Sequence, residues 1–282
     1  MGVRRPTQAG SFYAGDAGSL RVQIESCFLG GLGPGKLPKV AADGPRRVVG
    51  LVCPHAGYVY SGAVAAHAYL ELALDGVPET VVVLGPNHTG YGSALALVDE
   101  GVWRTPLGDV EVDSVVARAI VRETGLVDVD EVAHRFEHSV EVQLPFLQYL
   151  YGSGFKFVPI CFGLQDLVSA EELGGALVEV LAGRNAVVIA SSDFTHYEPA
   201  LVAARKDGLA LKAVEALDAE EFFSVVESEN VTACGYGPIA AVITAAKGLL
   251  ATEAKLLQYK TSGDVTGDNS SVVGYAAVSF RK

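Results

Sequence analysis

Residues 81–88 read VVVLGPNH, a short run of aliphatic residues that ends in glycine, proline and a histidine. Two other segments have the same form: residues 48–57 read VVGLVCPHAG, and residues 187–196 read VVIASSDFTH. Short apolar runs bounded by turn residues are typical of buried strands in a mostly parallel sheet. In an open α/β sheet, ligands bind outside the carboxyl ends of such strands. The sequence therefore predicts that three histidines meet at one edge of a sheet.

Helical patterns alternate with apolar runs along the chain, which favours an α/β fold. Helices are expected near 16–29, 61–74, 113–123, 139–150, 170–181, 200–216, 219–227 and 238–250, and strands near 48–52, 80–84, 94–98, 155–161, 186–190, 255–260 and 272–280. The last two strands follow one another without a helix, which predicts an antiparallel hairpin at one edge. Because the sequence has no repeat and no linker, we expect a single α/β domain over residues 1–282. Its mixed sheet is expected to be mostly parallel, with helices on both faces.

Composition excludes several classes of protein. The chain has 282 residues, of which 50% are hydrophobic and 19% charged, so it can bury a large core. A net charge of −12 argues against a sequence-independent grip on nucleic acid, which requires clustered lysine and arginine. No apolar run reaches the roughly 18–20 residues that span a bilayer. The N-terminus also lacks a signal-peptide hydrophobic region, so we expect a cytoplasmic protein that binds neither nucleic acid nor membrane.

The four cysteines form no CxxC pair, which argues against a zinc ribbon or a redox dithiol. Cys27, Cys53 and Cys161 fall in apolar segments and are expected to pack in the core. Cys234 differs, because it lies just before the last predicted helix. A thiol near a helix N-terminus is a candidate for a lowered pKa, and so for a metal-binding or reactive thiolate.

The strand-end histidines have both a functional and a plain interpretation. His55 and His88 can meet on one cation, or each can be a turn histidine with one backbone hydrogen bond. Asp193 and His196 share a face if the chain turns helically between them. Asp193 would then be a ligand or would orient an imidazole, and His196 would be a general base. The alternative for this pair is a cap before the helix near residue 200.

A fourth histidine, His138, lies at the start of a predicted helix, where it either lines the site or simply begins the helix. Glu141 falls in the first turn of the same helix. The helix dipole favours a carboxylate there, so a structural role and a site role are equally open. His134 is expected on the surface.

These motifs, in this order, resemble the Memo family, whose prokaryotic members are also called AmmeMemoRadiSam system protein B. The matching stretches run nearly from end to end: RP at 5–6 with AGSFY at 9–13, PHAGY at 54–58 with SG at 61–62, LGPNH at 84–88, EHS at 137–139 with Glu141 and QLPF at 143–146, SSDFTHY at 191–197, CG at 234–235, and TSGD at 261–264 with VGY at 273–275.

The resemblance implies a fold related to class III extradiol dioxygenases. Those enzymes hold non-haem Fe(II) with two histidines and one carboxylate. By this correspondence His55 and His88 would be the imidazole ligands, and Cys234 would take the third ligand position. A thiolate in place of the carboxylate shifts metal preference toward copper, zinc or thiolate-bound iron, and we expect iron or copper rather than zinc.

The same resemblance implies roles for three further residues. Asp193 and His196 would lie beside the metal, with His196 as the acid–base group, and His138 would fill another position in the pocket. Ring cleavage cannot be carried over with the fold, because function belongs to sites and not to architectures.

We therefore expect a metal-binding protein with redox chemistry on an unidentified small molecule. Two alternatives stay open: a non-catalytic module that holds a peptide or protein in the same cleft, and a zinc-dependent hydrolase, since zinc on the same ligands activates water. Prokaryotic genes of the family often lie beside AMMECR-type and radical S-adenosylmethionine genes, which implies partners in a shared modification pathway.

Overall fold

The three apolar runs form the centre of the sheet. In the computed structural model, which describes residues 2–282, they are β2 (Val48–Cys53), β3 (Thr80–Pro86) and β9 (Ala186–Ser191). β9 lies between the other two strands and pairs in parallel with both. Every residue of β2 and β3 is buried, which explains why these strands read as continuous apolar runs and not as an alternating pattern.

The main sheet has nine strands in the order β10-β12-β2-β9-β3-β8-β4-β7, with β11 paired to β12. Its other members are β4 (Leu95–Leu97), β7 (Asp128–Val129), β8 (Lys156–Phe162), β10 (His196–Glu198), β11 (Glu253–Thr261) and β12 (Val272–Arg281). β8 runs parallel to β3, whereas β12 runs antiparallel to both β2 and β11. The mixed sheet and the C-terminal antiparallel pair are as the sequence predicts. A small second sheet joins β1 (Val3–Arg4), β5 (Val102–Thr105) and β6 (Gly108–Glu111).

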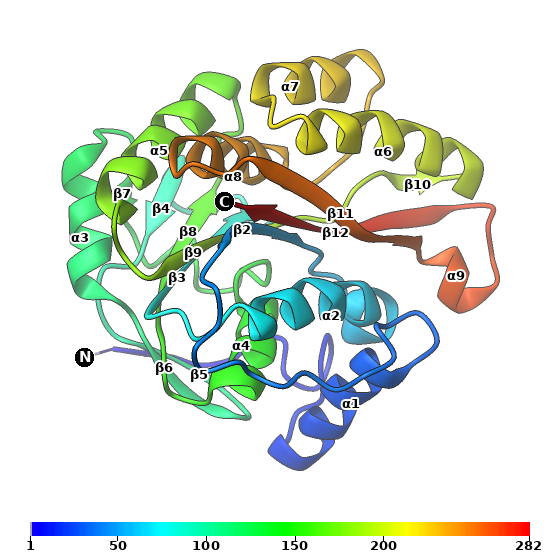
Figure 1. Ribbon diagram of the computed structural model, residues 1–282, viewed down its shortest axis with the longest axis horizontal. Coiled ribbons are helices and arrows are strands. Elements are labelled where there is room, and N and C mark those ends of the chain that lie inside the picture. The colour runs from blue at the N-terminus through cyan, green and yellow to red at the C-terminus, as the bar shows by residue number, and fades with distance from the viewer. Residues whose placement is uncertain (1) are drawn as a thin grey trace.

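Helices cover both faces of the main sheet (Figure 1). α2 (Tyr58–Leu74) packs against β2 and β12, and α1 (Ala17–Leu29) and α4 (Leu144–Tyr151) contact α2. On the other face, α8 (Tyr236–Gly248) packs against β2, β3 and β9. The remaining helices are α3 (Ser114–Glu123), α5 (Leu167–Leu181), α6 (Ala200–Glu215), α7 (Ala219–Ser228) and the single turn α9 (Gly263–Thr266).

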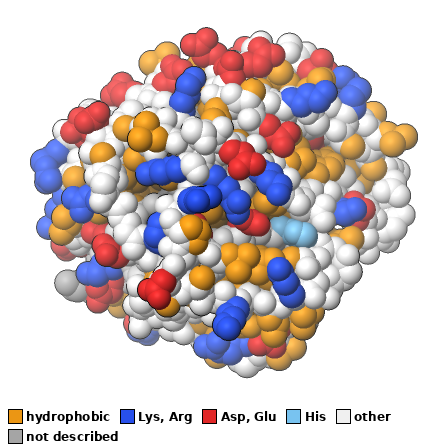
Figure 2. All heavy atoms as spheres, in the orientation of Figure 1, with side chains coloured by type: hydrophobic (Ala, Val, Ile, Leu, Met, Phe, Trp, Pro, Cys, Tyr) orange, Lys and Arg blue, Asp and Glu red, His pale blue; other side chains and the backbone are white. Residues whose placement is uncertain are grey.

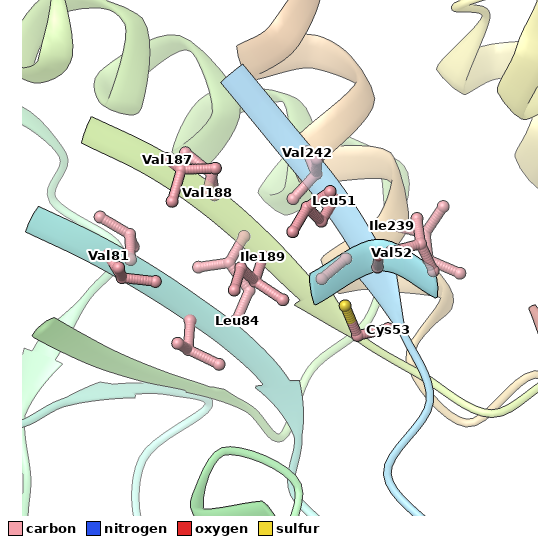
Figure 3. Close-up of a cluster of buried hydrophobic side chains, with 14 of the residues drawn as sticks. Leu51, Val52, Cys53, Val81, Leu84, Val187, Val188, Ile189, Ile239 and Val242 are labelled. Atoms are coloured by element: carbon pink, nitrogen blue, oxygen red, sulfur yellow. The ribbon is translucent and has the colours of Figure 1, made fainter. Parts of the chain in front are cut away.

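The core beneath α8 explains one glycine inside a buried strand. Figure 3 shows Ile239 and Val242 of α8 over the side chains of β2, β3 and β9. A Cβ at Gly50 of β2 would lie 2.9 Å from Val242 Cγ1, closer than real packing allows. The missing side chain at Gly50 therefore lets α8 rest on the strands that end at the histidines.

One predicted helix needs correction. The segment expected to be helical over 139–150 is a 3₁₀ helix, η1 (Glu141–Gln143), followed by α4. Pro145 lies in the first turn of α4, where its missing N–H costs least, so the α-helix begins later than the apolar pattern suggests. This irregular entry leaves residues 137–140 free to reach the sheet edge.

Among residues 2–282, no helix combines the length and the apolar character needed to cross a bilayer. On the face shown in Figure 2, acidic and basic side chains are interspersed, with apolar groups between them.

Candidate metal centre

The strand ends bring two of the predicted ligands to one place. β2 and β9 end level with each other, because Cys53 is paired with Ser191. His55 follows the end of β2 by two residues, and His88 follows the end of β3 by two residues. The two imidazoles lie at the same sheet edge, with ring centroids 5.2 Å apart.

A third imidazole arrives from the segment before η1. Gly85 of β3 allows this approach, because a Cβ there would lie 2.4 Å from Ser139 Oγ. The Ser139 hydroxyl donates to the carbonyl of Pro86 at 2.8 Å and pins the segment to the strand end. His138, the preceding residue, is thereby held 4.5 Å from His88 and 5.4 Å from His55 between ring centroids.

The three imidazoles form a group that could hold a metal ion. Within residues 2–282, His55, His88 and His138 each offer a nitrogen, and these nitrogens all lie within 4.8 Å of one another. The side chains of His88 and His138 are 34% and 20% exposed, whereas His55 is buried. An ion held here would be anchored inside the protein at His55 and reached from solvent at His88.

Cys234 adds a sulfur donor on the His55 side. Its Sγ lies 3.2 Å from His55 Nε2. Because metal ions such as zinc bind imidazole nitrogen at about 2.0–2.1 Å and thiolate at about 2.3 Å, one ion can span this separation. The nitrogen and sulfur donors therefore suit a soft or borderline transition metal.

Glu137 holds the rings of both solvent-facing imidazoles. Its Oε1 lies 3.0 Å from His88 Nδ1 and 3.3 Å from His138 Nδ1. The same oxygen accepts the backbone N–H groups of His138 and Ser139, each at 2.8 Å. With Nδ1 facing the carboxylate, Nε2 is left as the ligand atom, an arrangement common around protein-bound metals.

Burial and hydrogen bonding shift the pKa values of His55, His138 and Glu137 in the directions that favour metal binding. Burial lowers the pKa of His138 to about 4 and that of His55 well below its ordinary value. Burial alone would raise the pKa of Glu137, but the hydrogen bond and charge of His88, with His138 and the Ser139 N–H, hold it well below its usual range. His55 and His138 therefore keep neutral imidazoles with a free lone pair, and the carboxylate of Glu137 stays ionised.

Asp193 lies beside Cys234 and His55, but it does not contact an imidazole ring nitrogen. Its Oδ1 accepts the backbone N–H of His55 at 2.8 Å, and its own N–H donates to Cys234 Sγ at 3.3 Å. Burial raises the pKa of Asp193 to about 6. Asp193 thus links the His55 loop to the Cys234 loop through backbone contacts.

The expected acidity of the Cys234 thiol is wrong. Burial, with the nearby charge of Asp193, raises the pKa of Cys234 instead of lowering it. Desolvation outweighs the position just ahead of α8, and a bound cation would be needed to reverse it.

His196 lies outside the imidazole group, on β10. Its backbone N–H donates to Thr232 Oγ1 at 2.7 Å, and its Nδ1 lies 2.9 Å from the Thr232 carbonyl. Because a carbonyl only accepts, Nδ1 carries the proton and Nε2 is left as a base. Residues 193–196 do not turn helically, so the pairing of Asp193 with His196 on one helix face does not occur.

The structure decides between the two roles left open for Glu141. Its carboxylate is buried and contacts Arg4 Nη1 at 2.7 Å, the hydroxyl of Tyr13 at 2.7 Å and the backbone N–H of Gln8 at 2.8 Å. Glu141 therefore ties down the N-terminal segment, which sets the Phe12 ring against that of His138 at 4.8 Å between centroids.

The surface position predicted for His134 is also wrong. The residue is 1% exposed, its Nε2 lies 3.0 Å from the Ala96 carbonyl, and its ring packs edge-on against Trp103. Arg4 lies over the Trp103 ring at 4.0 Å from its centroid and donates from Nε to the carbonyl of His134 at 2.8 Å. The N-terminal segment thus helps to bury a histidine that its own sequence neighbours do not mark as a core residue.

Comparison with known proteins identifies the family. The model of the family described as Memo-like protein matches residues 4–279. A MEMO1 family protein of Methanopyrus kandleri is 56% identical, over 99% of both chains. A MEMO1 family protein of Methanothermobacter thermautotrophicus is 51% identical, over 98% of this chain and 100% of the relative.

A solved structure shares the fold at much lower identity. The crystal structure of an uncharacterized protein from Escherichia coli K12 superposes with a TM-score of 0.58 at 14% identity. It covers 82% of this chain and 99% of the other chain. At this identity the likeness concerns the fold alone. The full-length family match and the two archaeal relatives show that this chain belongs to the Memo family.

Proposed function

We propose that this chain binds a redox-active transition metal, copper or iron, through Nε2 of His55, Nε2 of His88 and the thiolate of Cys234. His138 would stand at the edge of the same cluster. The observation that supports this proposal best is the presentation of the rings. Ser191 Oγ holds Nδ1 of His55 at 2.9 Å.

Glu137 plays the matching part on the other side, at 3.0 Å from His88 Nδ1. Rings held at Nδ1 leave Nε2 as the ligand atom, which is how proteins orient histidine ligands, and one nitrogen of each ring lies within 4.8 Å of the others. Imidazoles that merely filled space would have no reason to converge in this way.

The choice of third ligand would decide the metal. Imidazole suits zinc, copper and iron alike, whereas thiolate favours copper and thiolate-bound iron among the redox metals. The separation of 3.2 Å between Cys234 Sγ and His55 Nε2 supports a sulfur ligand.

A bound copper or iron ion would supply one-electron chemistry to a small molecule. The residues of the chain would move protons, position the ligand loops and exclude water. His196 Nε2 would hold or move a proton, since the Thr232 carbonyl engages Nδ1 and leaves Nε2 unpaired with that group. Asp193 would keep the His55 and Cys234 loops in register through its backbone contacts, and Phe12 would shield one side of His138 from water.

The three-imidazole group favours one second candidate, a zinc-dependent hydrolase. Catalytic zinc sites often use three histidines and leave a fourth position for water. In that case His138 would replace Cys234 in the ligand set. The two candidates therefore differ in one residue.

Metal counting tests the proposal. Chain purified without chelator is loaded anaerobically with Fe(II), Cu(I) or Zn(II), and bound metal is counted. We expect one ion per wild-type chain and none in the His55→Ala/His88→Ala double variant. If both proteins bind equally little metal, the site does not exist.

Two single variants separate the candidates. Cys234→Ser should abolish the sulfur-to-metal charge-transfer absorption of the oxidised ion and weaken copper or iron more than zinc, while His138→Ala should leave the absorption in place. Zinc binding that is unchanged in Cys234→Ser and lost in His138→Ala would favour the hydrolase. Oxygen uptake with a panel of catechols then tests for redox turnover.

A further inference from the structure

We infer that a buried chain of neutral hydrogen bonds, running from Tyr69 through Gln143 to Ser191, fixes the tautomer of His55 with its proton on Nδ1. These three residues would be positioning residues, since each acts only through His55. Their consequence for metal binding rests on the proposed function, but the tautomer itself can be measured without a metal.

The first fixed point is the carbonyl of Pro54. Gln143 Nε2 lies 3.0 Å from this oxygen, which can only accept, so this end of the amide is the nitrogen. The same nitrogen donates to Ser191 Oγ at 2.7 Å. The other end, Oε1, accepts the hydroxyl proton of Tyr69 at 2.6 Å. The orientation of the Gln143 amide is therefore set from both ends.

The second fixed point is the carbonyl of Ser139. Ser191 Oγ lies 2.6 Å from it, and because a serine hydroxyl has a single proton, that proton is used here. Ser191 Oγ is left only as an acceptor, for Gln143 and for His55 Nδ1 at 2.9 Å. His55 must donate from Nδ1, and its unprotonated Nε2 then faces Cys234 Sγ.

Burial makes the arrangement hard to reverse. The members come from different parts of the fold: α2, η1, the end of β9 and the residue pair after β2. Water cannot replace a missing partner, because none is more than 1% exposed: Tyr69, Gln143, Ser191, Ser139 and His55. Turning any one bond around would set a buried donor against a donor, or an acceptor against an acceptor. The ligand atom is thus prepared by the fold.

The first test uses metal-free wild-type protein labelled with ¹⁵N-histidine. Long-range ¹H–¹⁵N correlation spectra distinguish the two neutral tautomers, and comparison with His55→Gln assigns the His55 signals. We expect the Nδ1–H form alone. An Nε2–H form, a doubly protonated ring or an exchanging mixture would overturn the inference. The measurement is made on the intact hydrogen-bond chain, so it does not depend on whether variants of that chain fold.

The second test asks whether the hydrogen-bond chain causes the tautomer preference of His55. Ser191→Ala should convert the His55 signals to a mixture of tautomers and weaken metal binding by about 10–100-fold, as removal of such partners typically does. Tyr69→Phe, at the far end, should weaken it less. The matched control is Ser279→Ala, because Ser279 is also a fully buried strand serine, and its Oγ has no partner within residues 2–282. A Ser191→Ala protein with unchanged tautomer and control-level affinity would refute the mechanism.

The outcomes also separate this inference from the proposed function. Wild-type protein that binds no metal but shows the Nδ1–H form would end the metal proposal and leave the inference standing. Protein that binds metal while its metal-free form shows Nε2–H would do the opposite. If Ser191→Ala does not fold, the wild-type spectrum and the graded effect of Tyr69→Phe still decide.

Discussion

The two sides of the imidazole cluster present the same ligand atom by different means. On the His55 side, a neutral hydroxyl from Ser191 receives Nδ1 in a fully buried setting. On the His88 and His138 side, the carboxylate of Glu137 does so beside solvent. A chain of hydrogen bonds between uncharged groups fixes the orientation of the ring without burying a charge. A carboxylate also makes its imidazole a stronger ligand, at the cost of desolvating an ion.

Glu137 meets that cost with many partners. Besides the ring of His88, its two oxygens accept the backbone N–H groups of His88, His138 and Ser139. Backbone donors stabilise a carboxylate without adding another titrating charge. On the Glu137 side, two of the backbone donors come from the next two residues and only His88 comes from a distant strand end, whereas the Ser191 side depends on four separate elements.

The largest expected effect follows from removing the carboxylate of Glu137. Glu137→Ala leaves the backbone N–H groups of His138 and Ser139 without an acceptor, and each unsatisfied buried donor costs about 1–3 kcal/mol, so the free energy of unfolding should fall by about 2–6 kcal/mol. Metal affinity should fall about 10–100-fold at the same time. Urea denaturation of the metal-free protein and metal titration measure the two effects.

The control for this comparison is Glu131→Ala, an exposed glutamate in the same loop. It should change neither quantity. Equal behaviour of the two variants would mean that Glu137 does not support the site.

A buried histidine outside the cluster, His134, should make the stability of the fold sensitive to acid. Burial lowers the pKa of His134 to about 4 from an ordinary value of 6.5. Between these values the unfolded chain binds a proton that the folded chain refuses, so stability falls as the pH drops from 6.5 to about 4. His134 alone should contribute on the order of 2–3 kcal/mol to this loss.

Denaturation curves at several pH values test the contribution. His134→Gln should flatten the loss of stability in acid, and His67→Gln, at a half-buried histidine outside the cluster, is the control variant. A wild-type slope in His134→Gln would show that other groups carry the acid sensitivity.

How far sequence predicts this molecule also differs between regions. β2, β3 and β9 could be predicted, because a strand buried on both faces leaves an unbroken apolar run. The convergence of His55 and His88 follows from the same signal, since parallel strands end at one edge.

The residues that hold the rings could not be predicted in this way. Ser191 meets His55 across 136 positions of sequence, and Glu137 meets His88 across 49. A serine that ends a strand and a glutamate beside a histidine look alike in many proteins. The errors at His134 and Cys234 have the same origin, because burial by distant segments decides both.

The smallest predicted effect concerns the N-terminal segment, which packs beside His138. Tyr13→Phe removes the hydroxyl that donates to Glu141 at 2.7 Å and leaves the aromatic packing in place. A hydrogen bond to a charged group contributes about 1.5–3 kcal/mol, so the loss in unfolding free energy should lie near the lower end. Because the segment places Phe12 against His138, loosening it should speed hydrogen exchange around residues 8–13 and leave the His55 tautomer unchanged. A change in the His55 tautomer in this variant would mean that the two sides of the cluster are coupled. The hydrogen-bond chain from Tyr69 to Ser191 would then not support His55 independently of the N-terminal segment.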